Sequence, residues 1–288
     1  MTDFIDIAIG TFAMRPYVFA FFGAFLFACV PHVGWKRTLT FTVMAYLIAY
    51  ASEWLSINTG FPYGWYYYID TTRHQELWIG GVPFFDSFSY VFLTYCSYST
   101  ALFILSPLKS WRWNLVTLET RRIRRSFSVL ILGAFLQTFL DIVIDPVTLQ
   151  GSRWFLGQIY GYQNEGVHFG VPLSNYAGWL LTSLILVAVF QLIDARRLTD
   201  APRGVYNLPF RCLLGPILYL SVLAFIITIA FWIGEASMGL SGILIHTLPL
   251  LITVVLALQK VNHYTRSELA EHIKDYPWSP AGRFEKDA

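Results

Sequence analysis

The sequence contains seven apolar runs, each close to the roughly 20 residues that an α-helix needs to cross the hydrocarbon core of a bilayer. Hydrophobic residues make up 56% of the chain and charged residues only 13%, a balance far more apolar than that of a soluble domain of this length. We therefore expect an all-α integral membrane protein with seven transmembrane helices. The expected spans are residues 17–33, 39–57, 82–105, 127–144, 173–193, 212–233 and 239–258.

Basic residues fall almost entirely on one side of this expected arrangement. All but three of the 20 lysines and arginines lie in the first, third and fifth connections or after the last span; the exceptions are Arg15, Arg73 and Arg153. Because cytoplasmic loops carry the excess of Lys and Arg, we expect the N-terminus outside and the C-terminus in the cytoplasm. The residues before the first span lack the basic region and cleavage site of a signal peptide, so that helix is expected to be retained.

This pattern predicts a multi-pass protein of the cell (inner) membrane. The membrane domain is expected over residues 1–266, and a polar cytoplasmic tail over residues 267–288. The net charge of +2 comes from basic residues between apolar runs rather than from a groove-like patch, so no nucleic acid is expected as a partner. The expected partner is instead the lipid bilayer.

Acidic residues gather at the outer level of the expected spans. Asp141 and Asp145 stand four residues apart, so a helix presents both on one face. Glu53 lies near the outer end of the second span, Asp86 in the first turn of the third and Asn175 in the first turn of the fifth. Carboxylates in apolar surroundings are costly unless they are paired, hydrated or protonated. We interpret this one-sided set as a shared site; the alternative is that each residue marks a helix end in contact with water and headgroups.

The second and fourth loops share a sequence pattern. Each contains a Tyr-Gly-aromatic element followed by Gly-Val-Pro, at residues 81–83 and 170–172, and Asp86 and Asn175 each stand five positions after that glycine. Proline is favoured at the first position of a helix, so both motifs indicate helix starts. We therefore expect a parallel repeat in which spans two and three match spans four and five around one cleft. A chance match is the alternative, since Gly and Pro are common at helix starts.

The same loops are rich in aromatic residues. An interfacial belt of Trp and Tyr explains many of them, but the run at residues 65–68 exceeds what a belt requires. Aromatic faces can line a slot for a flat apolar ligand and stabilise a transient cation. The candidate substrate-binding residues are Tyr63, Trp65, Tyr67, Tyr160 and Trp179.

Several chemistries find no support in the sequence. The six histidines form no clustered pairs, and no dinucleotide-binding or phosphate-binding glycine motif is present. Cys29, Cys96 and Cys212 fall in apolar runs without metal-ligand spacing and are interpreted as small core residues. The last span has no central lysine for a retinal Schiff base, since Lys260 is at its cytoplasmic end. No metal and no cofactor are expected.

Four segments, in order, carry a resemblance to a known family. They are Glu53 followed by Gly-Phe-Pro-Tyr-Gly-Trp-Tyr at residues 60–66, the Gly-Val-Pro helix start at 81–83, Asp-Ile-Val-Ile-Asp-Pro at 141–146, and Gly-Val-Pro-Leu-Ser-Asn-Tyr-Ala-Gly-Trp at 170–179. Over residues 53–179 the chain resembles the membrane carotenoid biosynthesis family. That family includes the γ-carotene hydroxylase-type hydratases of bacteria and the bisanhydrobacterioruberin hydratase of haloarchaea.

The resemblance implies a hydro-lyase that adds water across the terminal double bond of an acyclic (ψ) carotenoid end group. It implies a carotenoid substrate and other enzymes of carotenoid biosynthesis as partners. The reaction needs a proton donor, stabilisation of a tertiary carbocation and a positioned water, but no metal, oxygen or nucleotide. These needs agree with the motifs that are missing from the sequence.

Helix dipoles suggest roles for the polar residues. Glu53, Asp141 and Asp145 lie near the C-terminal, negative ends of their expected helices, which together with burial favours the protonated form and makes them candidates for the general acid. Asp86 lies at a helix N-terminus, which favours ionisation, so it is the candidate for holding or deprotonating the attacking water. Asn175 would orient that water or an acid.

Two other interpretations remain open on the sequence alone. An isomerase or cyclase acting on the same end group would use the same acid and the same cation but would lose a proton instead of capturing water. A non-enzymatic seven-helix carrier of pigment or lipid, or a receptor, would use the outer carboxylates only to pair with Arg73 or Arg153.

Overall fold

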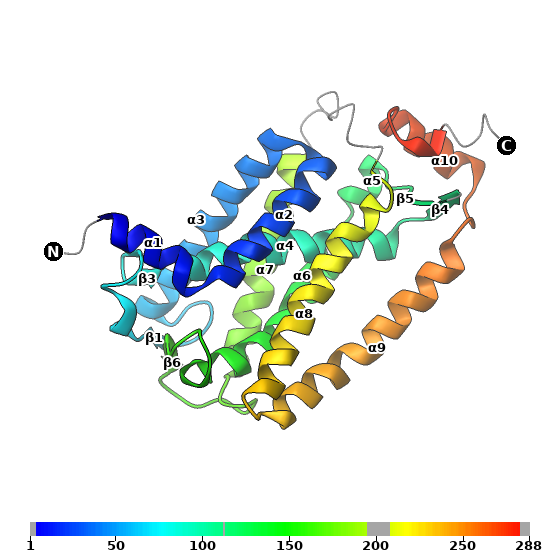
Figure 1. Cartoon of the computed structure of the whole chain (residues 1–288). Helices are drawn as coiled ribbons and strands as arrows, with labels where there is room; N and C mark the ends of the chain where they lie inside the picture. The colour runs from blue at the N-terminus through cyan, green and yellow to red at the C-terminus, as the bar shows by residue number, and fades with distance from the viewer. Residues whose placement is uncertain (1–3, 112, 195–207, 283–288) are drawn as a thin grey trace.

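The computed structural model describes residues 4–111, 113–194 and 208–282, and this part of the chain is mostly helical (Figure 1). Most of the helices are long, and two of the connections between them, residues 60–83 and 149–172, are long as well and contain short strands. The helices are α1 Phe4–Met14, α2 Pro16–Val33, α3 Trp35–Thr59, α4 Phe84–Leu105, α5 Arg121–Arg124, α6 Phe127–Thr148, α7 Leu173–Asp194, α8 Leu214–Trp232, α9 Ala236–Lys260 and α10 Arg266–Asp275.

Six helical segments in the described residues are long and apolar enough to cross a membrane: α2, α4, α6, α7, α8 with the 3-10 turn that precedes it, and α9. The chain is therefore a multi-pass membrane protein. The expected second span corresponds to α3, which is 25 residues long but is not among these six, and which contains Lys36, Arg37 and Glu53. A seventh span, the orientation and the repeat stay predictions.

The centre of the bundle is α4. It packs against α2, α3, α6, α7 and α8, and almost every residue from Tyr90 to Phe103 is buried. The opposite case is α9, which lies along α8 at one side of the bundle (Figure 1) and buries only 11% of its apolar window. An apolar helix with so little protein contact is suited to face lipid.

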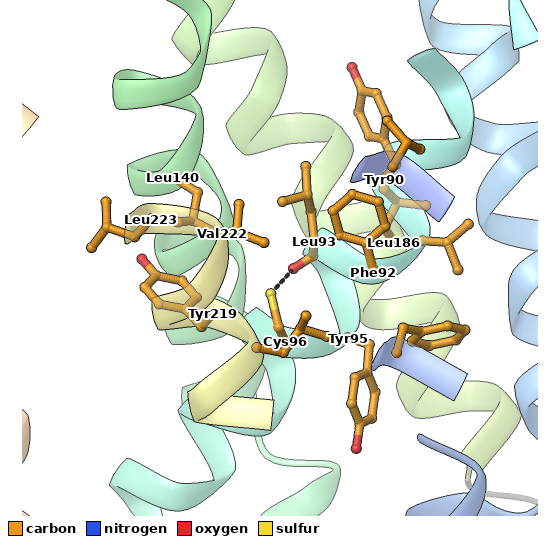
Figure 2. Close-up of a cluster of buried hydrophobic side chains, with 14 of the residues drawn as sticks. Tyr90, Phe92, Leu93, Tyr95, Cys96, Leu140, Leu186, Tyr219, Val222 and Leu223 are labelled. Carbon is orange, nitrogen blue, oxygen red and sulfur yellow. Dashed lines mark hydrogen bonds between the residues drawn. The ribbon is translucent and has the colours of Figure 1, made fainter. Parts of the chain in front are cut away.

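The helices α4, α6, α7 and α8 share a dense apolar core (Figure 2). Leu93 and Cys96 from α4 meet Leu140 from α6 and Tyr219 and Val222 from α8 there. Cys96 is fully buried, and its thiol donates to the Leu93 carbonyl at 3.2 Å. Cys29 is buried as well, as expected for a small core residue, whereas Cys212 is only partly buried.

Short strands join the loops at the two ends of the bundle (Figure 1). At one end β4 (Leu108–Trp111) and β5 (Asn114–Thr117) form a hairpin near α5 and α10. At the other end β2 (Trp78–Ile79) pairs with β3 (Val82–Pro83) just before α4. There also β1 (Tyr66–Tyr68) pairs antiparallel with β6 (Tyr160–Tyr162), with Tyr66 opposite Tyr162 and Tyr68 opposite Tyr160. The two loops that share a sequence pattern are thus hydrogen-bonded to each other.

The expected polar tail begins with a folded segment. Helix α10 starts with a capping box between Thr265 and Glu268. Its Leu269 packs with Val116 and Leu118, so the helix docks on the β4–β5 end of the bundle. The predicted domain boundary after residue 266 falls at the first residue of this helix, and residues 283–288 of the tail lie outside the described residues.

Candidate active site

A cavity of about 120 Å³ lies among the helix ends next to the loops that β1 and β6 pair. Since an internal water needs about 10–15 Å³ measured this way, the cavity has room for several waters or a small branched group. One part of its wall is polar and another is apolar and aromatic. Its polar wall includes Glu53, Tyr66, Tyr68, Asp86, Tyr90, Asp145, Thr148, Tyr160, Tyr162 and Asn175, and its apolar wall includes Val18, Phe21, Phe92, Leu93, Ile144, Trp154, Val222, Phe225 and Ile226.

On the α6–α7 side, three donors converge on Asp145. The Tyr160 hydroxyl donates to Oδ1 at 2.9 Å, the Tyr162 hydroxyl donates to Oδ2 at 2.8 Å, and Asn175 Nδ2 donates to Oδ2 at 2.5 Å. The same Asn175 nitrogen lies 3.1 Å from Asp141 Oδ2. Asp141 and Asp145 therefore do present their carboxyl groups on one face of a helix, as their spacing predicts.

Helix α6 continues to Thr148, beyond the expected end of the span at residue 144. The helix tolerates Pro146 in its last turn, where the Leu149 amide and the Thr148 hydroxyl donate to the Asp145 carbonyl. Asp145 is consequently held by helical backbone, and not by a flexible loop. Asp141 itself does not line the cavity but lies one turn deeper, and its Oδ1 has no donor among the described residues.

On the α3–α4 side, two further carboxyl groups reach the cavity. Asp86, in the first turn of α4 as predicted, accepts a hydrogen bond from the Tyr68 hydroxyl at 2.6 Å. Glu53 is 3% exposed and accepts from the Ser87 hydroxyl at 2.5 Å. The Tyr66 hydroxyl lies 3.4 Å from the Glu53 carbonyl oxygen. The structure thus brings Glu53, Asp86, Asp145 and Asn175 to one cavity, with Asp141 directly behind.

Strand alternation decides which loop aromatics reach the site. Successive side chains of a β-strand point to opposite faces, and in β1 the cavity receives Tyr66 and Tyr68. Trp65 and Tyr67 do not line the cavity; their side chains are 47% and 49% exposed. Tyr66 and Tyr68, which were not predicted, thus take the place of Trp65 and Tyr67 in the cavity wall. The alternation of a strand over residues 65–68 allows only these two pairs of side chains to face the same side.

The loop tyrosines are held as hydrogen-bond donors. Burial raises the pKa of Tyr66 and Tyr68 well above the ordinary value for a phenol. Burial likewise raises the pKa of Tyr160 and Tyr162, and the neighbouring Asp145 charge raises it further. All four hydroxyls therefore stay protonated at neutral pH.

The other predicted aromatics, Tyr63 and Trp179, line the cavity together. Trp179 stacks on Tyr90, with ring centroids 4.3 Å apart and ring planes within 3°. The Tyr63 hydroxyl donates to Thr182 at 3.0 Å, which ties its loop to α7. This contact depends on Gly178, because a Cβ there would lie 2.6 Å from the backbone of the loop at residue 62.

The apolar wall is built mainly by α2, α4 and α8. Tyr17 stacks on Phe225 with ring centroids 5.1 Å apart, and Phe21 meets the same ring edge-on at 5.6 Å. Leu93 and Val222 line the cavity and also belong to the core shown in Figure 2. The apolar wall of the cavity is therefore continuous with the core of the bundle.

Arginines on this side of the protein pair with other acidic residues. Arg15 is fully buried, forms an ion pair with Glu76 and lies over the Phe85 ring at 3.9 Å. Arg153 pairs with Glu235, which lies in the turn between α8 and α9. The ion pairs found within the described residues do not include the carboxyl groups of the cavity, and those residues contain no cluster of three His, Cys, Asp or Glu suited to a metal ion.

The fold and the cavity define a class of protein: a multi-pass membrane protein with an acid-lined pocket at one end of its helical bundle. The comparisons identify the family. The carotenoid biosynthesis protein family matches the chain over residues 5–249, and the chain belongs to it. The resemblance noted in the sequence is thereby confirmed.

A relative of known designation is the bisanhydrobacterioruberin hydratase of Haloarcula japonica, which is 29% identical over 202 residues. The aligned region covers 66% of this chain, and it spans 60% of the length of that relative. No solved structure matches the chain.

Proposed function

We propose that this protein is a carotenoid hydratase that adds water across the terminal double bond of an acyclic (ψ) end group. The observation that carries the proposal is the composition of one cavity, in which carboxyl groups and tyrosine hydroxyls meet an aromatic and aliphatic wall. Family membership and the designation of the haloarchaeal relative point to the same substrate class. Hydration of an isolated alkene needs these elements: an acid, a surface that stabilises a cation, and bound water.

The substrate would lie with its polyene in the bilayer and its end group in the pocket. An extended carotenoid is about as long as the hydrocarbon core is thick, roughly 30 Å. Only one end can then reach a pocket at one membrane face. The wall formed by Phe21, Phe225 and Val222 would hold the last apolar carbons next to the polar groups.

Glu53 is the candidate that fits direct proton donation best. It lines the cavity, is 3% exposed, and accepts a hydrogen bond from Ser87, with the Tyr68 and Tyr90 hydroxyls also nearby. Burial of a carboxyl group beside a second one, here Asp86, favours its neutral form. In the proposed step its proton goes to the less substituted alkene carbon, and the cation forms on the tertiary carbon.

Asp145 and Asp86 suit the opposite role. Three donated hydrogen bonds favour the ionised form of Asp145, and the Tyr68 bond together with the helix N-terminus favours the ionised form of Asp86. An anion beside the cation stabilises it, and the same anion can take the proton that the attacking water releases. Water supplies the oxygen, so no other reactant is consumed.

Two features of the architecture belong to the same proposal. We infer that α3 is a seventh span and that the basic β4–β5 end is cytoplasmic, which places the cavity at the outer face. We also infer that α3–α4 and α6–α7 are a parallel repeat. The pairing of β1 with β6 supports the repeat, because it joins corresponding loops of the two halves.

The test is mass spectrometry of pigments from a bacterium that accumulates lycopene, with and without this protein. A product heavier by one water supports the proposal. Glu53→Gln should abolish that product, whereas Glu165→Gln, at an exposed position on the same side, should not. An isomer of unchanged mass would show a cyclase or isomerase instead, and unchanged lycopene with correctly folded protein would contradict action on this substrate.

A further inference from the structure

The face of α6 that carries the aspartates continues deeper into the bundle. Gly133, Gln137, Asp141 and Asp145 follow one another at intervals of four residues, so they share one face of the helix. The Asn175 hydrogen bonds show that this face meets α7 at its outer end. Every residue of the four is a buried residue of α6.

Contacts at Gly133 show which helices cover the deeper end of this face. A Cβ at Gly133 would lie 3.5 Å from the Tyr98 backbone of α4 and 3.5 Å from the Val187 side chain of α7. One turn outward, this register places Gln137 of α6 at the level of Ser183 of α7. One turn further outward lie Asp141 and the Trp179 wall of the cavity.

The layer that contains Gln137 and Ser183 has unused hydrogen-bonding capacity. Both side chains are fully buried. Within the described residues, Gln137 Oε1, Gln137 Nε2 and Ser183 Oγ have no hydrogen-bond partner, and neither has Asp141 Oδ1 one turn away. Buried polar atoms almost always have a partner, because burying them without one is unfavourable.

The chemistry of these atoms selects the ligand. The side chains of Gln137 and Ser183 offer both donors and acceptors and carry no net charge. They lie between the closely packed helices α6 and α7. A small neutral molecule that donates and accepts at once satisfies all of them, and internal water is the ligand that does so in protein interiors.

We propose that Gln137 and Ser183 bind internal water in contact with Asp141. This water site extends the polar part of the cavity from Asp141 toward the middle of the membrane. Its catalytic role rests on the proposed hydratase function. Each hydration consumes one water, and the proton that the acid gives to the alkene is matched by the proton that the base takes from that water. A reserve of water beside Asp141 can therefore supply the next turnover without opening the apolar wall.

X-ray hydroxyl-radical labelling of the full-length protein in lipid nanodiscs tests the site without any substrate. Radicals formed from bound water modify the side chains around it. Leu186, one turn from Ser183 and fully buried (Figure 2), should be modified several-fold faster than Phe25, which is equally buried between α2 and α4. Equal protection of the two side chains would overturn the proposal.

Variants separate the water site from general packing. Gln137→Leu, and independently Ser183→Ala, should lower Leu186 labelling several-fold and should lower kcat more than they change KM. Thr138→Val is the matched control, because that hydroxyl already donates to the Ala134 carbonyl of the same helix. Unchanged Leu186 labelling in both folded variants would refute the site. Labelling as expected in a protein without hydratase activity would leave the water site standing and reject the proposed function alone.

Discussion

Asp145→Asn is the substitution for which the structure gives the sharpest expectation. The native carboxylate accepts from Tyr160 at one oxygen and from Tyr162 and Asn175 at the other. An amide of the same shape has one oxygen only, so its NH2 group must face at least one of these donors. The best orientation keeps the Tyr162 and Asn175 bonds without their charge, and the Tyr160 hydroxyl, which also lies 2.5 Å from the Thr148 hydroxyl, no longer donates to this side chain.

The cost follows from these three bonds. Losing one charge-assisted hydrogen bond costs about 1.5–3 kcal/mol, and the two that remain weaken to roughly 1 kcal/mol each. Relief of the repulsion with Asp141 and easier burial of a neutral group offset part of the loss. The expected net destabilisation is roughly 2–4 kcal/mol, or a fall in Tm of about 4–8 °C at about 2 °C per kcal/mol.

Asp141→Asn provides the matched comparison. Asp141 accepts from Asn175 through one oxygen, and its other oxygen has no donor among the described residues. The amide oxygen keeps the one accepted bond, and the NH2 group takes the place of the oxygen that has no donor. We expect a change in stability within about 1 kcal/mol.

Both variants are measured by thermal unfolding of the purified protein and by pigment turnover. Turnover should fall at least about 100-fold in Asp145→Asn, since general acid or base groups contribute about 10²–10⁴. Equal loss of Tm in the two variants would refute the hydrogen-bond assignment. Wild-type turnover in a folded Asp145→Asn protein would remove Asp145 from the mechanism.

Three further predictions follow from the site and the tail. Tyr68→Phe removes the donor to Asp86 and should lower kcat roughly 10- to 100-fold. Tyr67→Phe on the exposed face should leave kcat unchanged. A larger loss of kcat in Tyr67→Phe than in Tyr68→Phe would contradict the strand register. Phe225→Ala should raise KM roughly tenfold with little change in kcat, because it removes apolar wall but no polar group. Burial lowers the pKa of His272 below its ordinary value near 6.5, so the undocked segment binds a proton that docked α10 does not. Docking should therefore weaken as pH falls below about 6.5. Amide hydrogen exchange in α10 that does not change between pH 7.5 and 5.5 would contradict this.

Helix positions could be predicted from the sequence because hydropathy alone decides which segments enter a bilayer. The expected spans agree with α2, α4, α6, α7, α8 and α9 to within a few residues at most ends. The end of α6 was placed too early, since Pro146 is a weak stop signal when it falls in a last turn. The docking of α10 could not be foreseen, because it depends on contacts between segments that are far apart in sequence.

The acidic part of the site could be predicted because charge is rare in these helices. Each of Glu53, Asp86, Asp141 and Asp145 stands out against an apolar background, and helix spacing alone places the aspartates of α6 on one face. The aromatic part was less accessible. Sequence shows that residues 65–68 are rich in aromatics, but the choice of face depends on the pairing of β1 with β6, which joins loops about 90 residues apart.

That pairing also explains why a two-sided site can exist in this bundle. The α3–α4 side holds Glu53, buried beside Asp86 and surrounded by hydroxyl groups, and the α6–α7 side holds Asp145 with two tyrosine hydroxyls and the Asn175 amide. Because β1 brings Tyr68 to Asp86 while β6 brings Tyr160 and Tyr162 to Asp145, one small ribbon sets the environments of both sides. A reaction that must donate a proton at one point and accept a proton at another needs this difference between carboxyl groups, and an unmodified repeat with identical halves would not provide it.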